Sequence, residues 1–392
     1  MTPPATRRVV HISTVHSALD PRVRLKELRT IAEAGLEAHF VTVDPLAREN
    51  GDGVIVHRVG RDRSNRLRRM FVLAPLAVFA ALRIRAAGYH IHDPELLPWA
   101  WLLLARLVPV VYDVHEDFAR FMRHKPYIPE PVGVAIGGLV GLVERLLAAP
   151  FRIVIAEHCY RPRFPSATAI LNYPRRKTAR ALAPVPRGQH ARDSAGDAGT
   201  AHLLYTGNLT VARGALNIVE LVRRSTVTHV TCVGECKQPV ARLIARRVGD
   251  AADRLHIVGE GRYVPFSEIE EHYRRPDWLA GIVLMPDSPH YRDKQLTKFF
   301  EYMAAGLPII ASDFPAWRRL VEGEGVGICV DADDPQSVLA AVARLQADPF
   351  LTAEMGSRGR ELVRSRYLWE HQAGRLVSMY ERGRVGSHPA SS

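Results

Sequence analysis

Residues 296 to 312 read LTKFFEYMAAGLPIIAS. The pattern predicts a loop, a short helix that ends at Gly306 and a buried strand, because glycine commonly ends a helix and the run that follows is apolar. Thr297 and Lys298 would lie in the first helical turn, where free backbone N–H groups bind phosphate. Glu301 follows one turn after Thr297 on the same face, where its carboxylate suits two neighbouring sugar hydroxyls.

Apolar runs and helical segments alternate on both sides of this stretch. Gly214–Arg224, Gln238–Val248, Pro335–Leu345 and Trp369–Tyr380 have helical patterns. The strands predicted in this half of the chain are 202–205, 227–233, 255–258, 281–285, 308–311 and 327–330. Such alternation is typical of a parallel sheet covered by helices.

The first half of the chain alternates in the same way. A strand over Val9–Ser13, a helix over Arg22–Ala34 and a strand over Ala38–Val43 form a βαβ opening. Further strands are predicted at 53–59, 89–92, 108–114, 153–156 and 169–171. We therefore expect an α/β protein with two tandem Rossmann-like domains that face each other across a cleft, with helices at the C-terminus.

Composition sets the predicted domain boundaries. Residues 175–200 are rich in Pro, Ala, Gly and charge without an apolar period, so we interpret them as a linker. They would join an N-terminal domain, residues 1–174, to a C-terminal domain, residues 201–368. A C-terminal helix over 369–384 would then be free to pack back on the N-terminal domain, ahead of a tail over 385–392.

The charge balance indicates an anionic partner. The 392 residues include 53 Lys+Arg against 41 Asp+Glu, a formal net charge of +12. A membrane surface, a phosphorylated substrate and nucleic acid each fit that balance. The basic residues are not interleaved with aromatic residues and match no nucleic-acid-binding module, so we expect no nucleic-acid partner.

Cysteine content and apolar runs bear on location. Four scattered cysteines are typical of a reducing compartment. The first eight residues lack the apolar core of a signal peptide. The longest uncharged apolar runs, 131–143 and 96–105, are shorter than the ~18–20 residues of a membrane-spanning helix. We expect a cytoplasmic protein, with peripheral attachment to the inner face of the plasma membrane left open.

Several motifs are missing from the sequence, and each missing motif argues against a class of enzyme. The loop over residues 13–20 has no Gly-x-Gly-x-x-Gly, and the chain has no Gly-Lys-Ser/Thr phosphate loop, His-Glu-x-x-His or Gly-x-Ser-x-Gly. An Asp-x-Asp occurs at residues 331–333, but it precedes Asp334-Pro335 and a helical pattern, so helix capping is the better interpretation. We predict neither a metal nor a cofactor.

The acidic residue Asp293, seven intervening residues, Glu301 and then YMAAGLPIIAS form a pattern that resembles the C-domain signature of the family-four retaining glycosyltransferases. That family has the two-Rossmann GT-B fold and uses nucleotide-sugar donors. The resemblance extends to DFPAW at 313–317, GICVD at 327–331, YTGNL at 205–209 and ILNYP at 170–174. HDPELL at 92–97 and YDVHED at 112–117 resemble the versions in members that build surface polysaccharides.

The resemblance implies roles for residues that bind the donor. Glu301 would hold the donor ribose hydroxyls, next to Thr297. Arg213, which precedes a glycine, would pair with the donor diphosphate, assisted by Lys298. Gly207 and Asn208 lie in the matching loop, with Asn208 at a position where many members have a second phosphate-binding arginine. The donor site residues implied in this way are Gly207, Asn208, Arg213, Thr297, Lys298 and Glu301.

The resemblance also implies catalytic roles for His115, Asp293, Arg213 and Lys298. His115 matches a histidine that lines the pocket of the transferred sugar. Asp293 stands where the family has a glutamate that holds this sugar, and its side chain is one methylene shorter. The reaction would be a same-face attack, in which a leaving phosphate oxygen takes the acceptor proton and the two cations stabilise the diphosphate.

Each of these side chains has a simpler interpretation. Glu301 and Asp293 are also what a solvent-facing helix and a surface loop contain. Arg213 would equally suit a solvated helix terminus, and His115 a histidine with local hydrogen bonds. The motif at 92–94 would also serve only to end a strand.

A basic cluster precedes a predicted apolar helix in the N-terminal domain. Residues 58–71 contain six arginines against one aspartate, directly before Val72–Leu82. Such a segment can lie on anionic lipid, so Arg58–Arg69 are a candidate contact with an anionic membrane surface. A solvated basic loop on a buried helix is the alternative.

The sequence as a whole predicts a retaining, metal-independent hexosyltransferase. It would transfer a sugar from a nucleotide-diphosphate-sugar donor to a saccharide or lipid-linked acceptor in polysaccharide or glycoconjugate biosynthesis. A nucleotide-sugar epimerase and a nonenzymatic sugar-nucleotide-binding subunit are the alternatives. The donor base, the sugar and the acceptor are not predicted.

Overall fold

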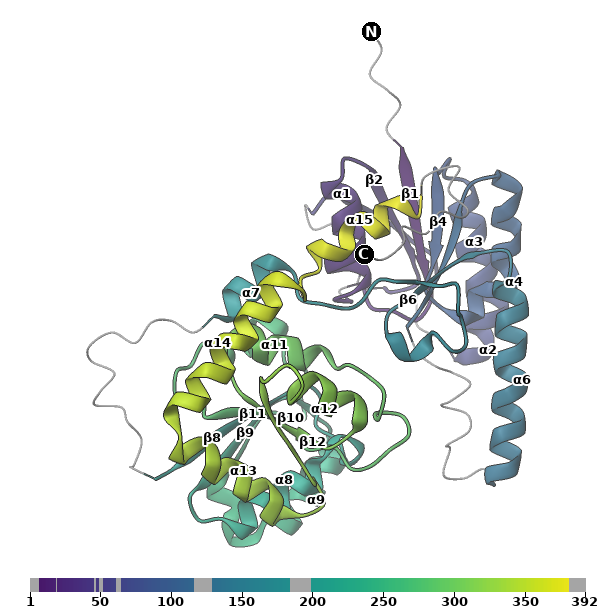
Figure 1. Ribbon diagram of the computed structural model, residues 1–392. Helices are drawn as coiled ribbons and strands as arrows, with labels where there is room; N and C mark the ends of the chain where they lie inside the picture. The colour runs from purple at the N-terminus through teal and green to yellow at the C-terminus, as the bar shows by residue number, and fades with distance from the viewer. Residues whose placement is uncertain are drawn as a thin grey trace. The chain divides into compact units, whose positions relative to one another are not determined.

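The computed structural model describes residues 7–18, 20–45, 47–48, 52–60, 65–115, 129–183 and 199–380 (Figure 1). The chain divides into two compact units. The N-terminal unit comprises residues 1–172 together with 369–392, and the C-terminal unit comprises residues 173–368. Each unit is an α/β fold built on one parallel sheet.

The N-terminal unit contains a seven-stranded sheet in the order β3-β2-β1-β4-β5-β6-β7. Its strands are β1 (Arg8–Ser13), β2 (Glu37–Thr42), β3 (Val54–Arg58), β4 (Gly88–Ile91), β5 (Val110–Val114), β6 (Arg152–Ile155) and β7 (Thr168–Ala169). All neighbouring strands pair in parallel. The strand order reverses between β1 and β4, so the carboxyl ends of these two strands form the topological switch point, where such sheets bind ligands.

Helices cover both faces of this sheet (Figure 1). Right-handed crossovers in the direction β3 to β4 to β5 to β6 place α3, α4 and α6 on one face, and the reverse crossover places α1 on the other. The helical segments are η1 (Val23–Leu28, a π-helix), α1 (Arg29–Glu33), α2 (Arg66–Arg68), η2 (Arg69–Leu73), α3 (Ala74–Leu82), η3 (Pro94–Leu96), α4 (Leu97–Ala100), η4 (Trp101–Arg106), α6 (Glu130–Ala148) and η5 (His158–Tyr160).

The last helix, α15 (Glu370–Ser378), packs in the N-terminal unit, next to α1. Trp369 Nε1 donates to Thr30 Oγ1 at 2.7 Å, and both side chains are buried. Leu376 and Tyr380 are part of the same apolar core as Val9 of β1. Helix α15 and the residues that follow it therefore share one apolar core with strand β1.

The C-terminal unit contains a six-stranded parallel sheet in the order β10-β9-β8-β11-β12-β13. Its strands are β8 (Ala201–Thr206), β9 (Thr228–Cys236), β10 (Leu255–Glu260), β11 (Ala280–Val283), β12 (Ile309–Ser312) and β13 (Gly327–Val330). Its helical segments are α7 (Arg176–Leu182), η7 (Val211–Arg213), α8 (Ala215–Arg224), α9 (Gln238–Val248), η8 (Gly249–Arg254), α10 (Phe266–Tyr273), α11 (Thr297–Ala305), α12 (Pro315–Val321), α13 (Pro335–Ala347) and α14 (Pro349–Ser365). The switch point of this sheet lies between β8 and β11.

Two local expectations differ from the structure. The predicted linker, 175–200, begins with helix α7, which contacts α10 and α11, and residues 184–198 lie outside the described part. Helix α6 has 19 residues and is long and apolar enough to cross a membrane by length and composition alone. The uncharged run stops at Val143, but the helix continues through Glu144 and Arg145. The length of the uncharged run therefore underestimated the length of the helix.

Candidate functional site

In the C-terminal unit, two glycines bring the backbone close to the switch point. Gly207 follows β8 with a φ of 94°, and Gly214 precedes α8 with a φ of 90°. A Cβ added to Gly214 would lie 1.9 Å from the carbonyl oxygen of Leu284, which directly follows β11. Only glycine therefore allows the loop before α8 to lie against the end of β11, and Arg213 is positioned by this approach.

Lys298, in the first turn of α11, points into the same region. Its side chain is 8% exposed, and its Nζ has no hydrogen-bond partner among the described residues. The Nζ lies 3.8 Å from the centre of the Tyr205 ring, and a Cβ added to Gly207 would be 3.7 Å from it. Burial, together with the charge of Arg213, lowers the pKa of Lys298 to about 7, although the charge of Glu301 opposes the shift. A buried ammonium beside a glycine turn is suited to bind an anion.

Glu301, one turn after Lys298, is held by the buried Tyr273, and the buried Tyr302 contacts the adjacent end of β8. Tyr273 Oη donates to Glu301 Oε2 at 2.9 Å and contacts Thr206 Oγ1 at 2.8 Å. The backbone N–H of Thr206 donates to Tyr302 Oη at 3.1 Å. Tyr273 therefore fixes the Glu301 carboxylate beside Thr206, the last residue of β8.

The other predicted donor residues lie on the loops around this point. Thr297 is exposed at the first position of α11, and Arg213 is half-buried. Asn208 is exposed, and its carbonyl oxygen accepts from Tyr205 Oη at 2.9 Å. Asp293 is exposed in the loop between β11 and α11, beside Arg292, which forms an ion pair with Asp287. Arg213, Lys298 and Glu301 interact electrostatically.

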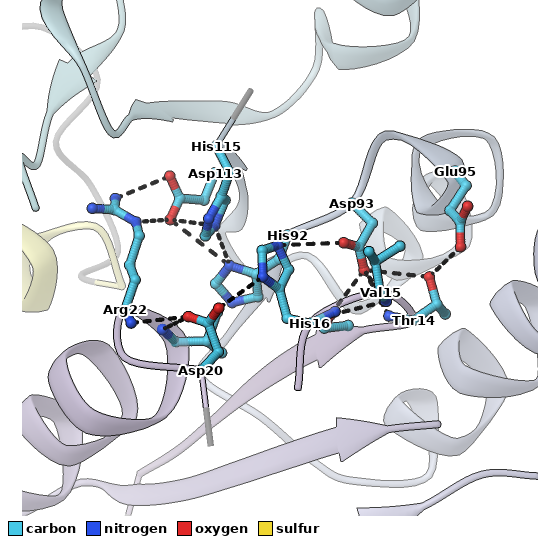
Figure 2. A network of polar contacts seen from close by, with 12 residues as sticks. Thr14, Val15, His16, Asp20, Arg22, His92, Asp93, Glu95, Asp113 and His115 are labelled. Atoms are coloured by element: carbon cyan, nitrogen blue, oxygen red, sulfur yellow. Dashed lines mark hydrogen bonds and ion pairs between the residues drawn. The ribbon is translucent and has the colours of Figure 1, made fainter. Parts of the chain in front are cut away.

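The switch point of the N-terminal unit contains a dense polar network (Figure 2). Asp113 accepts from Arg22 Nε at 2.9 Å and Arg22 Nη2 at 3.1 Å, and lies 3.1 Å from His115 Nε2. Burial acts to raise the pKa of Asp113, but the Arg22 guanidinium and His115 hold it well below the usual range. Asp113 is therefore a buried, ionised anchor for both groups.

A chain of hydrogen-bonded histidines leads inward from His115. Its Nε2 lies 3.0 Å from His92 Nδ1, and His92 Nε2 lies 2.9 Å from His11 Nδ1. His11 Nε2 and His90 Nδ1 both contact Tyr380 Oη, at 3.0 and 2.6 Å. Burial lowers the pKa of His11, His90 and His92, so these rings are neutral. In a neutral chain, the tautomer of each ring fixes that of the next.

Glu27, buried beside this chain, is a second carboxylate in the same cluster. Burial and the charge of Asp113 raise the pKa of Glu27 well above its usual range, although Arg22 Nε lies 3.1 Å from Glu27 Oε1. Glu27, His90, His92 and Asp113 each place one potential metal ligand within 4.8 Å of the others. However, Arg22 already bridges both carboxylates, and both His92 nitrogens have hydrogen-bond partners. The contacts fit a protonated Glu27 beside the ionised Asp113 and Arg22 better than a coordinated metal.

Asp93, in the motif at 92–94, fastens the first loop. Its Oδ2 accepts from the backbone N–H groups of Thr14 at 2.6 Å and Val15 at 3.2 Å. His16 lies on this loop, with its ring 4.4 Å from that of His115 and its Nδ1 3.1 Å from Asp20. Burial alone would lower the pKa of His16, but Asp20 and Asp93 raise it to about 8.

Sequence reasoning missed several members of this network, namely His11, His16, Asp20, Arg22, Glu27 and Tyr380. The sequence did contain a signal for this network. Charged and imidazole side chains stand at positions where the apolar periodicity predicts buried residues. His115 is the one predicted site residue that the structure places in the network, and it is only partly exposed.

Comparison with known proteins identifies the C-terminal unit. Residues 200–348 match the family Glycosyl transferases group 1. The matched stretch lies within the C-terminal unit. The lipopolysaccharide core biosynthesis mannosyltransferase LpsB of Rhizobium meliloti is 28% identical over 160 residues, which is 40% of this chain and 40% of the relative. The curated relative is thus matched over less than half of its length.

The chain as a whole has the fold of solved GT-B proteins. Sucrose-phosphate synthase from Thermosynechococcus elongatus superposes with a TM-score of 0.73 at 18% identity, over 95% of this chain and 98% of that one. HepE from Anabaena, in complex with UDP and glucose, gives 0.69 at 13% identity, over 94% and 98%. The predicted fold class, two Rossmann-like domains of the GT-B type, is confirmed.

Proposed function

We propose that the protein is a retaining, metal-independent glycosyltransferase that transfers a hexose from a nucleotide-diphosphate-sugar donor to a saccharide or lipid-linked acceptor. The observation that carries this proposal is the buried Lys298 ammonium without a hydrogen-bond partner among the described residues. It lies one helical turn from Glu301 at the switch point of a group 1 glycosyl transferase domain. A cation and a fixed carboxylate so close together match a diphosphate next to a ribose.

In this proposal the donor is held mainly by the C-terminal unit. Lys298 and Arg213 bind the diphosphate, with the N–H groups of the first turn of α11 and the turn at Gly207 and Asn208. Glu301 accepts hydrogen bonds from both ribose hydroxyls, because Tyr273 Oη, which also contacts Thr206 at the end of β8, holds the carboxylate in place. Thr297 supplies a hydroxyl at the start of the same helix.

The reaction breaks the bond between the anomeric carbon and the diphosphate oxygen, and the acceptor oxygen bonds to that carbon from the same face. The acceptor proton passes to the leaving phosphate oxygen. Arg213 and Lys298 stabilise the charge that develops on the diphosphate, which is the largest contribution expected from the protein. We assign His115 and Asp293 to the transferred sugar, where an imidazole and a carboxylate orient its hydroxyls.

The relatives bear on the sugar and on the setting. LpsB is named as a lipopolysaccharide core mannosyltransferase, which favours transfer of a hexose over epimerisation and supports a role in surface glycoconjugate biosynthesis. HepE was solved with UDP and glucose, so the donor base is left to experiment. A lipid-linked acceptor agrees with the basic cluster Arg58–Arg69, of which residues 61–64 lie outside the described part. We propose a cytoplasmic protein that reaches this acceptor at the inner membrane face.

A thermal-shift screen tests this proposal. UDP-, GDP-, ADP- and dTDP-hexoses are added to the wild type and to the Glu301→Ala variant, because a donor stabilises the folded protein by mass action. One donor class should raise the melting temperature of the wild type and not of the variant. Thr210→Ala, a substitution in the same region outside the proposed contacts, is the matched control. An equal shift in wild type and Glu301→Ala would contradict the assigned donor site.

The matching donor is then incubated with acceptor mixtures. Release of the nucleoside diphosphate that requires acceptor supports transfer. Conversion of the sugar without acceptor would identify an epimerase, and donor binding without turnover would identify a nonenzymatic subunit.

A further inference from the structure

Helix α6 of the N-terminal unit has an unusual distribution of side chains. Its buried positions are Gly133, Gly137, Gly141, Glu144 and Ala148, so small residues face the protein. Its large apolar side chains face outward instead. The exposed fractions are 48% for Val132, 49% for Val134, 63% for Leu139, 53% for Leu142, 45% for Val143 and 61% for Leu146.

Two neighbouring segments extend this apolar surface. Trp101 of η4 is 47% exposed, and its Nε1 donates to the carbonyl oxygen of Leu147 in α6 at 2.9 Å. Trp99 of α4 donates to the carbonyl oxygen of Met70 in η2 at 3.0 Å. Phe71 and Phe79, on η2 and α3, are 64% and 51% exposed. Helix α3 contacts α4 and η4, so α3, η4 and α6 form one layer on a single face of the sheet, as Figure 1 shows for the helices.

The same layer is strongly basic. Within the described stretches 65–107 and 129–148, the exposed acidic residue is Glu130. The exposed basic residues are Arg66, Arg68, Arg83, Arg85, Arg106 and Arg145. An apolar surface with a cationic rim is complementary to an anionic bilayer, where apolar side chains enter the acyl region and arginines reach the headgroups.

The anchoring of α6 decides between crossing the membrane and lying on it. Glu144 Oε1 accepts from Tyr112 Oη at 2.7 Å and from Arg163 Nη2 at 2.8 Å, in the interior of the unit. Insertion across a bilayer would pull this ion pair and the glycine face away from the sheet. The helix is therefore suited to lie in the interface with its outer face in lipid.

We infer that the outer face of α3, η4 and α6 docks on an anionic lipid bilayer, with α6 in the plane of the interface. We call this surface the α6 layer. The inference deepens the membrane placement in the proposed function, which named only Arg58–Arg69. It does not require transfer activity, because the surface lies outside the donor-binding residues.

Vesicle flotation tests this inference. The full chain is mixed with phosphatidylcholine vesicles that contain no or about 30% phosphatidylglycerol, at low and high salt. The wild type should float with anionic vesicles at low salt. The double variant Leu142→Ser, Leu146→Ser should lose flotation, and Arg83→Glu with Arg145→Glu should weaken it by roughly fivefold per arginine. Matched controls in the C-terminal unit are Phe350→Ser, which removes a side chain that is 80% exposed, and Arg246→Glu.

Sedimentation velocity distinguishes the rival occupant, a second copy of the chain. A dimer that the double variant converts to a monomer, without vesicle binding, would overturn the inference, and so would a monomer that binds no vesicles. A thermal shift with the donor is measured on every variant. An intact shift with lost flotation supports docking by the α6 layer, whereas a lost shift in the wild type contradicts only the donor assignment.

Discussion

The two sheets of this protein have the same topology around their switch points, but the switch points are filled differently. In the N-terminal unit the buried cation Arg22 is matched by Asp113 and Glu27 within 3.1 Å. In the C-terminal unit the buried cation Lys298 has an aromatic ring and a glycine turn around its Nζ, and no hydrogen-bond partner among the described residues. In the first arrangement the cation is already paired without a ligand, whereas the cation of the second gains most from binding an anion.

The largest effect is expected when each of the two carboxyl side chains of the N-terminal unit, Asp113 and Glu27, is replaced by its amide. Asp113→Asn leaves Arg22 buried without its ionised partner and should cost about 3–5 kcal/mol, which lowers the melting temperature by about 10 °C. Glu27→Gln copies a protonated carboxyl and should leave the melting temperature nearly unchanged. Differential scanning calorimetry measures both, and equal losses would show that Glu27 is ionised as well.

In the C-terminal unit, Lys298→Met should have the opposite balance of effects. Turnover should fall about 10²- to 10³-fold, because a cation that stabilises the leaving diphosphate is lost. The melting temperature should stay the same or rise, since the variant no longer buries an amine. Steady-state kinetics and thermal melting on one preparation check both. A large loss of stability would mean that Lys298 is structural.

A smaller effect is expected at Tyr380. Tyr380→Phe removes the hydroxyl that contacts His11 and His90, and should cost about 1–3 kcal/mol. Because that hydroxyl orders the tautomers up to His115, the ¹⁵N chemical shifts of the His115 ring should also change. Unchanged histidine spectra would show that the chain does not transmit the tautomer. Tyr263→Phe, at a hydroxyl of an exposed ring in the C-terminal unit, is the control.

The smallest predicted effect is a pH dependence of donor binding. The pKa of Lys298 in the empty site is about 7, below its value in the unfolded chain. The burial of this charged amine therefore destabilises the fold fully below pH 7, and this destabilisation is lost as the pH rises from 7 toward 10.5. A bound diphosphate raises that pKa again. Donor affinity should therefore be greatest below pH 7 and fall above it by up to tenfold per pH unit. Affinity measured from pH 6 to 9 checks this slope, which Lys298→Met should abolish.

The fold was predictable because buried parallel strands correspond to short apolar runs in the sequence. The helix over Gln238–Val248 was predicted with the same bounds that the structure gives to α9. Thr297, Lys298 and Glu301 were predictable for a related reason, since one helix turn brings them together. The histidine network was not, because it joins residues such as His11, His90 and Tyr380 that only the sheet and the last helix bring into contact. The outward apolar face of α6 was not predictable for another reason. The buried face of this helix consists largely of glycines, so the large apolar side chains do not identify the face that packs on the protein.

The central claim is that Lys298 binds the donor diphosphate. Isothermal titration of the matching nucleotide-sugar into the wild type and Lys298→Met at pH 6.5 tests it most directly, because both proteins are compared where the wild-type amine is largely charged. A charge-assisted contact is worth about 1.5–3 kcal/mol, so the variant should bind roughly 10- to 100-fold more weakly. Equal affinity of the two proteins would contradict the claim.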